Sequence, residues 1–215
     1  FFTVEVRFCE QGDSTEVSIT KNIATAEAEV AIRQSIKQAN GHTTWDRLAE
    51  FLDESVYSQN SFHISRSFPV SQDKLFELWT NPELLVQWLS PTGTTMEFLA
   101  ADIRTGGSTK YRMGNSEFQM YGGANYISVT EPNYIQYTQK FFDENGNVSR
   151  HPMAPTWPET MITDIRFYPN QDEEAETRIA IRWEPFGSCT TQEVETFTSA
   201  RAGMTNGWGG SFAKL

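Results

Sequence analysis

Cysteine, histidine and long hydrophobic runs are all scarce in this sequence of 215 residues. The two cysteines, Cys9 and Cys189, lie far apart, which favours free thiols in a reducing compartment over a disulfide framework. No apolar run approaches the ~20 residues that a membrane helix requires. We therefore expect a cytoplasmic protein with no membrane partner.

Metal-binding spacings and basic clusters are also missing. His42, His63 and His151 fall in different segments, and the sequence has no CxxC or HExxH pattern, so we expect neither a metal nor a cofactor. The formal net charge of −11 repels phosphate backbones, and we therefore expect no nucleic-acid partner. The simplest explanation of the negative charge is that it keeps the protein soluble.

A stripe of large apolar side chains marks the C-terminal segment Thr190–Leu215. Its members recur at steps of seven, four, four and three residues, and they are Phe197, Met204, Trp208, Phe212 and Leu215. That spacing predicts one buried face of a long α-helix. Alternating apolar and polar residues predict strands at 62–68, 110–113, 118–121, 124–129, 134–141, 162–168 and 177–183. A long helix over such a sheet encloses either a packed core or a pocket.

The N-terminal residues 1–54 resemble the C-terminal part of the chain. TVEVRF at 3–8 matches ITDIRF at 162–167, TEVSIT at 15–20 matches TRIAIR at 177–182, and WDRL at 45–48 matches FAKL at 212–215. This order predicts a duplicated strand, strand and helix unit, although any hairpin followed by a helix gives a similar pattern. We expect 1–54 to be the last part of an incomplete first domain that begins upstream of Phe1, 55–61 a linker, and 62–215 a complete domain.

Two short helices follow the first strand of the complete copy. Ser71 is a typical N-cap for a helix over Asp73–Thr80, and Pro82 suits the first turn of a second helix over Glu83–Leu89. The glycine pairs at 106–107 and 122–123 are not followed by the Lys-Ser/Thr of a phosphate-binding loop. We expect these pairs to mark bulges or sharp bends in the sheet.

Four stretches together resemble a known family: FPVSQDKLFELWTNPELLVQWLSP, DIRTGGSTKYRM, WPETMITDIRF and GWGGSFAKL. The chain resembles the START-related helix-grip superfamily (SRPBCC), and within it the homologues of the activator of heat-shock protein 90 ATPase, over residues 62–215. The resemblance implies an α+β helix-grip fold, in which a curved antiparallel sheet wraps around a long C-terminal helix with a cavity between them.

Aromatic and methionine side chains are the candidate lining of that cavity, because they suit adaptable apolar binding. The candidate ligand-binding residues are Trp79, Trp88, Tyr111, Met113, Met120, Tyr126, Tyr137, Trp157, Trp183, Phe197, Met204 and Trp208. The alternative is that they fill the core. The proline-rich segment 149–160 is either a lid over the cavity or a plain connection between strands.

Few residues in the sequence are candidates for acid–base or nucleophilic chemistry. Asp102 and Arg104, with Glu117, are candidates for titratable groups in the cavity, and the alternative is an ion pair at the surface. Cys189 precedes the long helix, whose dipole would favour a thiolate, but no His or other base is nearby in sequence, which favours the alternative of a small loop residue. No catalytic residue is identified, and enzymatic activity is not expected.

Three functions remain open. The first is non-enzymatic binding of a small hydrophobic or amphipathic ligand, which predicts an apolar cavity of ~300 Å³ or more. Trp208→Ala would then weaken the binding of an apolar probe more than it lowers stability. The second, implied by the resemblance, is a co-chaperone-like regulator of a heat-shock protein 90 ATPase. The third is an enzyme similar to polyketide cyclases. A homodimer is left open.

Overall fold

The computed structural model describes residues 2–31, 47–48, 50–52, 59–169 and 176–215. The chain divides into two compact units, Phe1–Gly41 and His42–Leu215, and each is described here by itself. The division lies ahead of the expected linker at 55–61. Glu50 contributes to the second unit, because its carboxylate accepts a hydrogen bond from the backbone N–H of Ser65 at 2.7 Å.

The first unit contains a two-stranded antiparallel hairpin of β1 (Phe2–Gln11) and β2 (Ser14–Ile23), followed by helical residues 26–31. The turn uses Gly12 at φ 64°, a left-handed conformation that glycine adopts without steric cost. The helix of the expected repeat unit, matched at 45–48, lies partly outside the described residues.

The hairpin has the cross-strand register that the sequence match with the second unit predicts. Val6 lies opposite Ile19 in the hairpin, and the matched residues Ile165 and Ile181 lie opposite each other in β9 (Met161–Pro169) and β10 (Thr177–Pro185). Val6 and Ile19 are 46% and 40% exposed, whereas Ile165 and Ile181 are 0% and 1% exposed. The shared register supports a duplication, which stays a prediction.

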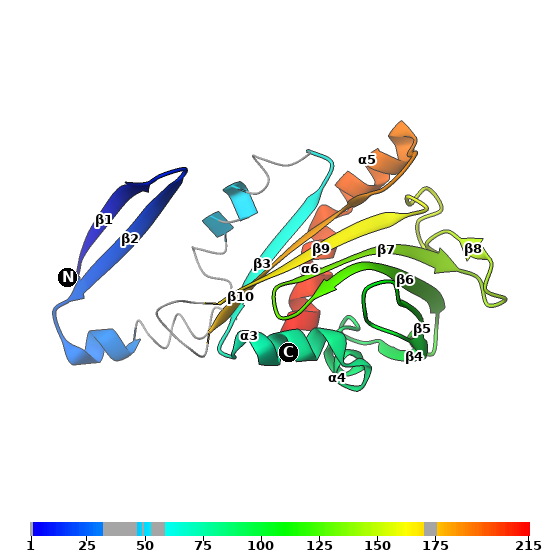
Figure 1. Ribbon diagram of the computed structural model, residues 1–215, viewed down its shortest axis with the longest axis horizontal. Coiled ribbons are helices and arrows are strands. Elements are labelled where there is room, and N and C mark those ends of the chain that lie inside the picture. The colour runs from blue at the N-terminus through cyan, green and yellow to red at the C-terminus, as the bar shows by residue number, and fades with distance from the viewer. Residues whose placement is uncertain (1, 32–46, 49, 53–58, 170–175) are drawn as a thin grey trace. The chain divides into compact units, whose positions relative to one another are not determined.

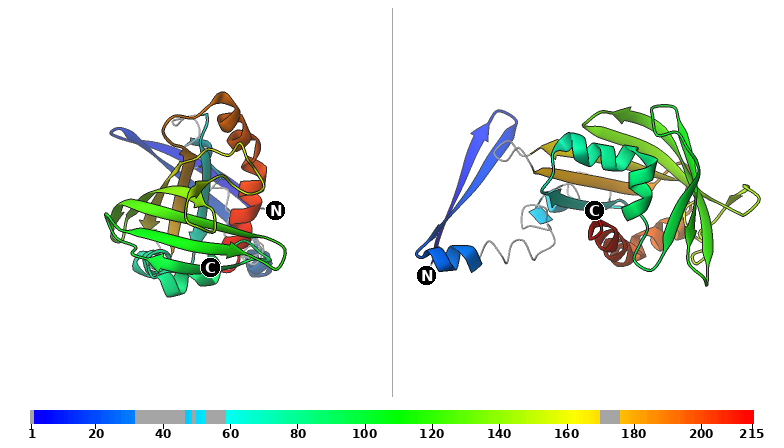
Figure 2. Two further views of the ribbon diagram at one scale, coloured as in Figure 1. Left: turned by 90° about the vertical axis from the view of Figure 1, so that its right-hand side faces the viewer. Right: turned by 90° about the horizontal axis from the view of Figure 1, so that it is seen from below.

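The second unit is one curved antiparallel sheet with helices on its concave side (Figures 1 and 2). Its strands have the order β3-β10-β9-β7-β6-β5-β4, and the short β8 pairs with β7. The strands not yet given are β3 (Phe62–Phe68), β4 (Thr95–Ala101), β5 (Ser108–Gly114), β6 (Gln119–Thr130), β7 (Tyr134–Phe142) and β8 (Val148–Ser149). This is the expected helix-grip arrangement, with β6 spanning the two strands expected at 118–121 and 124–129.

The helices α3 (Gln72–Thr80) and α4 (Pro82–Trp88) cover one end of the sheet. The side chain of Ser71 caps α3 by accepting from Lys74 N, and Asn81 caps α4 by accepting from Glu83 N, with Pro82 in the first turn. Leu75, Phe76 and Trp79 form the buried face of α3. Both helices therefore follow the expected boundaries to within one residue.

The long C-terminal helix is interrupted, which corrects the expectation of one continuous helix. It consists of α5 (Thr191–Ser199) and α6 (Arg201–Phe212), and the N–H of Ala200 bonds to the carbonyls of Phe197 and Thr198. The hydroxyl of Thr198 also bonds back to Val194 O at 3.0 Å, an arrangement that bends helices. Both segments lie along the concave side of the sheet (Figure 2).

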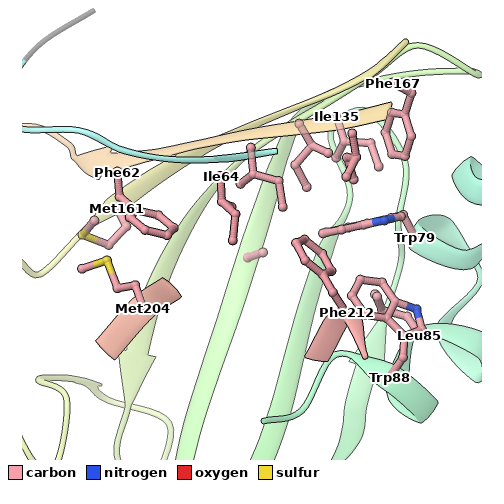
Figure 3. Packing of buried hydrophobic residues seen from close by; sticks show 14 of the residues in the cluster. Phe62, Ile64, Trp79, Leu85, Trp88, Ile135, Met161, Phe167, Met204 and Phe212 are labelled. Atoms are coloured by element: carbon pink, nitrogen blue, oxygen red, sulfur yellow. The ribbon is translucent and has the colours of Figure 1, made fainter. Parts of the chain in front are cut away.

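The core lies between α6, the two short helices and the inner sheet face. Figure 3 shows Phe212 among Leu85, Trp79 and Trp88, while Met204, two turns earlier in α6, lies beside Met161. Phe212 also packs edge-on against Phe68 at 5.5 Å between ring centroids. Aromatic contacts of this kind fix α6 against the sheet.

The bulges of the sheet do not lie at the glycine pairs, where the sequence predicted bulges or sharp bends. The register shifts lie between Phe98 and Ala100 and between Tyr126 and Ser128. Gly106 instead takes φ 79° in the turn before β5.

Candidate functional site

An apolar cavity of about 460 Å³ lies between the inner face of the sheet and α6. Its volume exceeds the ~300 Å³ expected of a ligand site. Ten of the twelve sequence-predicted residues line it: Trp79, Tyr111, Met113, Met120, Tyr126, Tyr137, Trp157, Trp183, Met204 and Trp208. Their role as ligand contacts stays a prediction.

Trp88 and Phe197 are brought close to the cavity but do not line it. Trp88 is 2% exposed, and its indole N–H donates to Leu78 O at 3.0 Å, which holds it behind Trp79. Phe197 is fully buried and packs behind the rings of Trp157 and Trp183 at 5.5 and 5.9 Å between centroids. Both residues pack behind lining residues, and their role as ligand contacts stays a prediction.

Small residues on α6 leave the space that the cavity occupies. The face of the helix toward the cavity presents Ala200, Gly203, Met204, Gly207, Trp208 and Ser211. A Cβ built on Gly203 or Gly207 meets no atom within 4 Å, so a larger side chain would enter open space. Sequence reasoning missed this feature, although the spacing of three and four residues between the small residues was visible.

The sheet side of the cavity carries a cluster of neutral hydroxyl groups. The hydroxyl of Tyr111 accepts a hydrogen bond from Gln139 Nε2 at 3.1 Å, and Tyr126 and Tyr137 pack with ring centroids 5.5 Å apart. Burial is the main cause that raises the pKa of Tyr111 and Tyr126 well above their usual value, and it raises the pKa of Tyr137 to about 12. These groups therefore stay protonated and can donate hydrogen bonds inside the cavity.

The segment 149–160 covers one end of the cavity. His151, Ala154 and Trp157 line the cavity, whereas Met153 is 76% exposed. Arg150 Nη1 fixes the segment by donating to Trp157 O at 2.8 Å and to Glu193 Oε1 of α5 at 2.6 Å. The segment thus connects β8 to β9 and also forms part of the wall.

His151 is a lining residue that the sequence analysis did not place in the site. Its Nδ1 accepts a hydrogen bond from Met153 N at 3.1 Å, and its ring packs edge-on against Phe141 at 5.1 Å. Burial lowers the pKa of His151, so the ring is neutral at pH 7. Because Nδ1 is the acceptor, the proton of the neutral ring is on Nε2.

The predicted polar groups lie outside the cavity. Asp102 and Arg104 form an ion pair at 2.9 Å, with side chains 48% and 71% exposed, in the turn between β4 and β5. Glu117 is also exposed. The surface alternative is therefore the correct one, and the residue pair that a cyclase-like mechanism required is not in the site.

The structure gives no support for a reactive thiol at Cys189 or, among the described residues, for a metal site. Burial and the nearby Glu193 raise the pKa of Cys189, opposite to the effect expected from the helix dipole. Within the described part of the chain, no three His, Cys, Asp or Glu side chains gather as a metal site would require, and His42 lies outside it. Over the same residues, no helix is long and apolar enough to cross a membrane.

A family model described as "Activator of Hsp90 ATPase homolog 1-like protein" matches residues 69–215. Among solved structures, a Chromobacterium violaceum protein is similar with a TM-score of 0.56 and 21% identity, over 73% of this chain and 94% of that one. A Staphylococcus epidermidis protein is similar with a TM-score of 0.56 and 22% identity, over 74% and 91%.

A third solved structure, a Silicibacter pomeroyi protein named AHSA1, is similar with a TM-score of 0.54 and 17% identity, over 72% of this chain and 94% of that one. At these identities the neighbours establish the fold. The comparison with curated proteins finds no significant match.

Proposed function

Because the chain belongs to the family of Activator of Hsp90 ATPase homolog 1-like proteins and has an apolar cavity of about 460 Å³, we propose that it binds a small hydrophobic or amphipathic molecule without converting it chemically. The observation that carries the proposal is the apolar pocket itself, whose wall on α6 is left open by Gly207. A pocket of this size and apolar lining exposes hydrophobic surface to water, and a ligand that covers this surface binds favourably.

The lining also favours binding over catalysis. Among the described lining residues, His151 is the one whose ordinary pKa lies near neutral pH, and the tyrosine hydroxyls stay protonated. Acid–base catalysis requires groups that exchange protons near the working pH, usually as a pair. A cavity with one such group is better suited to holding a molecule than to transforming it.

Filling the cavity tests the proposal. Gly207→Leu is expected to abolish binding of the neutral apolar probe N-phenyl-1-naphthylamine, measured by fluorescence titration, because the new side chain occupies the cavity. Gly209→Leu is the matched control, since Gly209 lies on the same helix, its Cβ also meets nothing within 4 Å, and it does not line the cavity. Both variants gain helix propensity by a similar amount. Equal binding by both variants would refute the proposal.

A natural ligand is sought by native mass spectrometry of the gently purified protein. A co-purifying small molecule that is present in the wild type and in Gly209→Leu, but absent from Gly207→Leu, would identify it. The same spectra report whether the protein is a monomer or a homodimer.

The family description favours a second candidate, regulation of a heat-shock protein 90 ATPase. This function is tested by measuring the ATPase rate of the cognate chaperone with and without the protein. An unchanged rate at saturating protein removes the candidate. A changed rate that persists in Gly207→Leu would place the regulatory function outside the cavity.

A further inference from the structure

We infer that the cavity selects a neutral ligand that has an aromatic or aliphatic body and a hydrogen-bond-accepting oxygen, such as a ketone, which the hydroxyl of Tyr111 binds. This inference rests on the proposed function, and it specifies the chemical class of the ligand. It depends on three properties of the lining: its charge, its balance of donors and acceptors, and the position of Tyr111.

The absence of charge in the lining excludes ionic ligands. Among the described residues that line the cavity there is no Asp, Glu, Lys or Arg. The ion pair between Arg150 and Glu193 joins the covering segment to α5, and neither residue lines the cavity. A carboxylate or ammonium group would therefore lose its hydration without gaining a counter-ion.

The lining contains groups that can only donate, beside hydroxyl groups and the Gln139 amide, which both donate and accept. Trp79, Trp157 and Trp183 line the cavity, and each indole N–H is buried without an acceptor. An indole can only donate, and the Nε2 proton of His151 is a further donor, because Nδ1 is already an acceptor. The indole nitrogens are themselves buried, so the donors left for a ligand are the hydroxyl of Tyr111 and Nε2 of His151, and an acceptor oxygen on the ligand complements these two groups.

Tyr111 has its hydroxyl proton available for a ligand. Its oxygen already accepts from Gln139 Nε2, so this oxygen is held in place and the hydroxyl proton can point elsewhere. Tyr126 and Tyr137 lie on the next two strands and also line the cavity. A carbonyl oxygen at this position accepts the hydroxyl proton, whereas a purely apolar ligand leaves that buried donor unpaired.

Three probes of equal size distinguish the possibilities: 2-acetylnaphthalene, in which the carbonyl is the acceptor, 2-isopropenylnaphthalene, in which a CH₂ group replaces the oxygen, and 2-naphthoate, which is charged. Calorimetric titration of the full chain is expected to give about tenfold tighter binding for the ketone than for the alkene. The naphthoate is expected to bind at least about a hundredfold more weakly than the ketone.

Tyr111→Phe is expected to remove the advantage of the ketone and to leave the affinity for the alkene within about twofold. Tyr121→Phe is the matched control, because Tyr121 is on β6 but does not line the cavity, and it should leave both affinities unchanged. Near-ultraviolet circular dichroism checks that each variant is folded. If Tyr111→Phe does not fold, the comparison of the three probes on the wild type still decides the inference.

The outcomes separate the two proposals. Equal affinities for the ketone and the alkene, or tightest binding of the naphthoate, would overturn the inference about the ligand class but leave the proposed binding function in place. No binding of any probe would overturn both. Tighter binding of the ketone that Tyr111→Phe does not reduce would show that another group is the donor and would overturn the role of Tyr111.

Discussion

The side chain of Tyr111 on β5 lies across the backbone of Gly122, its cross-strand partner on β6. The two residues are paired in the antiparallel register, and a Cβ built on Gly122 would overlap with the hydroxyl oxygen and Cζ of Tyr111. Only glycine leaves room for this orientation of the ring. Gly122 therefore positions the hydroxyl group that we expect to bind the ligand.

Gly122→Ala is expected to displace the Tyr111 ring and to lower the free energy of unfolding by about 1–3 kcal/mol, the usual cost of overpacking. Urea unfolding measures this loss, and titration with 2-acetylnaphthalene measures the loss of affinity. In a Tyr111→Ala background the same substitution should cost much less, because the clash is gone. An undiminished effect in that background would show that Gly122 matters for another reason.

Asp164 on β9 is the centre of a polar cluster on the outer face of the sheet. It accepts hydrogen bonds from Tyr134, from Gln136 Nε2 at 2.9 Å and from Arg182 Nη2 at 2.6 Å. Burial alone would raise the pKa of Asp164, but the hydrogen bonds from Tyr134 and Arg182 outweigh burial and lower it. The ionised form is thus stabilised in the folded protein.

Asp164→Asn is expected to lower the free energy of unfolding at pH 7 by about 2–4 kcal/mol, because Arg182 loses a charged partner. Since the folded-state pKa lies below the unfolded value of about 3.9, the stabilisation is complete above that pH and is lost as pH falls further. Urea unfolding at several pH values should show the wild type and variant converging below about pH 4. Glu159→Gln, on the exposed pair with Lys140, is the control and should change little.

The sequence predicts most of the fold because its signals are local. The stripe from Phe197 to Phe212, the alternation in β9 and β10, the N-cap Ser71 and the first-turn Pro82 are all signals within or beside one element. Strand β4 was not predicted, because its burial alternates only weakly and much of it is exposed.

The candidate site was only partly predictable, because whether a residue lines the cavity depends on how its helix or strand packs in the folded protein. Nothing local distinguishes Trp79, which reaches the cavity, from Trp88, which packs behind it. His151 reaches the site because the segment that carries it is fixed to α5 by Arg150. The glycines of α6 have low helix propensity, so the sequence alone gives no reason for them. They leave room for the cavity, and this role becomes visible only when the position of α6 against the sheet is known.

Arg66 on β3 carries a buried positive charge that has no acidic partner among the described residues. It is 8% exposed, its Nε and Nη1 atoms are buried without acceptors, and its guanidinium lies 5.8 Å from the centroid of the Phe212 ring. Burial lowers the pKa of Arg66, which indicates that the charged form is disfavoured here. A contact with an aromatic ring offsets only part of the desolvation cost.

Arg66→Met is therefore expected to raise the free energy of unfolding by about 1 kcal/mol or more in urea unfolding experiments, since it keeps the length of the side chain and removes the charge. Arg178→Met is the control, and it is expected to lower the free energy of unfolding instead of raising it. The guanidinium of Arg178 is closer to an aromatic ring, at 4.4 Å from the centroid of Tyr168, and it is less buried. Destabilisation by Arg66→Met would indicate that the guanidinium has a favourable partner.

His151 should make both stability and ligand binding depend on pH. Because burial lowers its folded-state pKa below the unfolded value of about 6.5, the unfolded chain takes up a proton first as pH falls. The folded protein therefore loses stability below about pH 6.5, and the loss ends once the folded-state pKa is passed. Protonation also places a positive charge in an apolar wall, which should weaken binding of a neutral probe.

Thermal unfolding and titration with 2-acetylnaphthalene at pH 8 and pH 5.5 measure the two effects. In His151→Gln, a neutral side chain at every pH, both quantities should change much less between the two conditions. The control His63→Gln removes a histidine on β3 that does not line the cavity, and its ligand affinity should keep the pH dependence of the wild type. If His151→Gln keeps the wild-type pH dependence of binding, another group titrates in the site and the neutral character of the wall would need a different explanation.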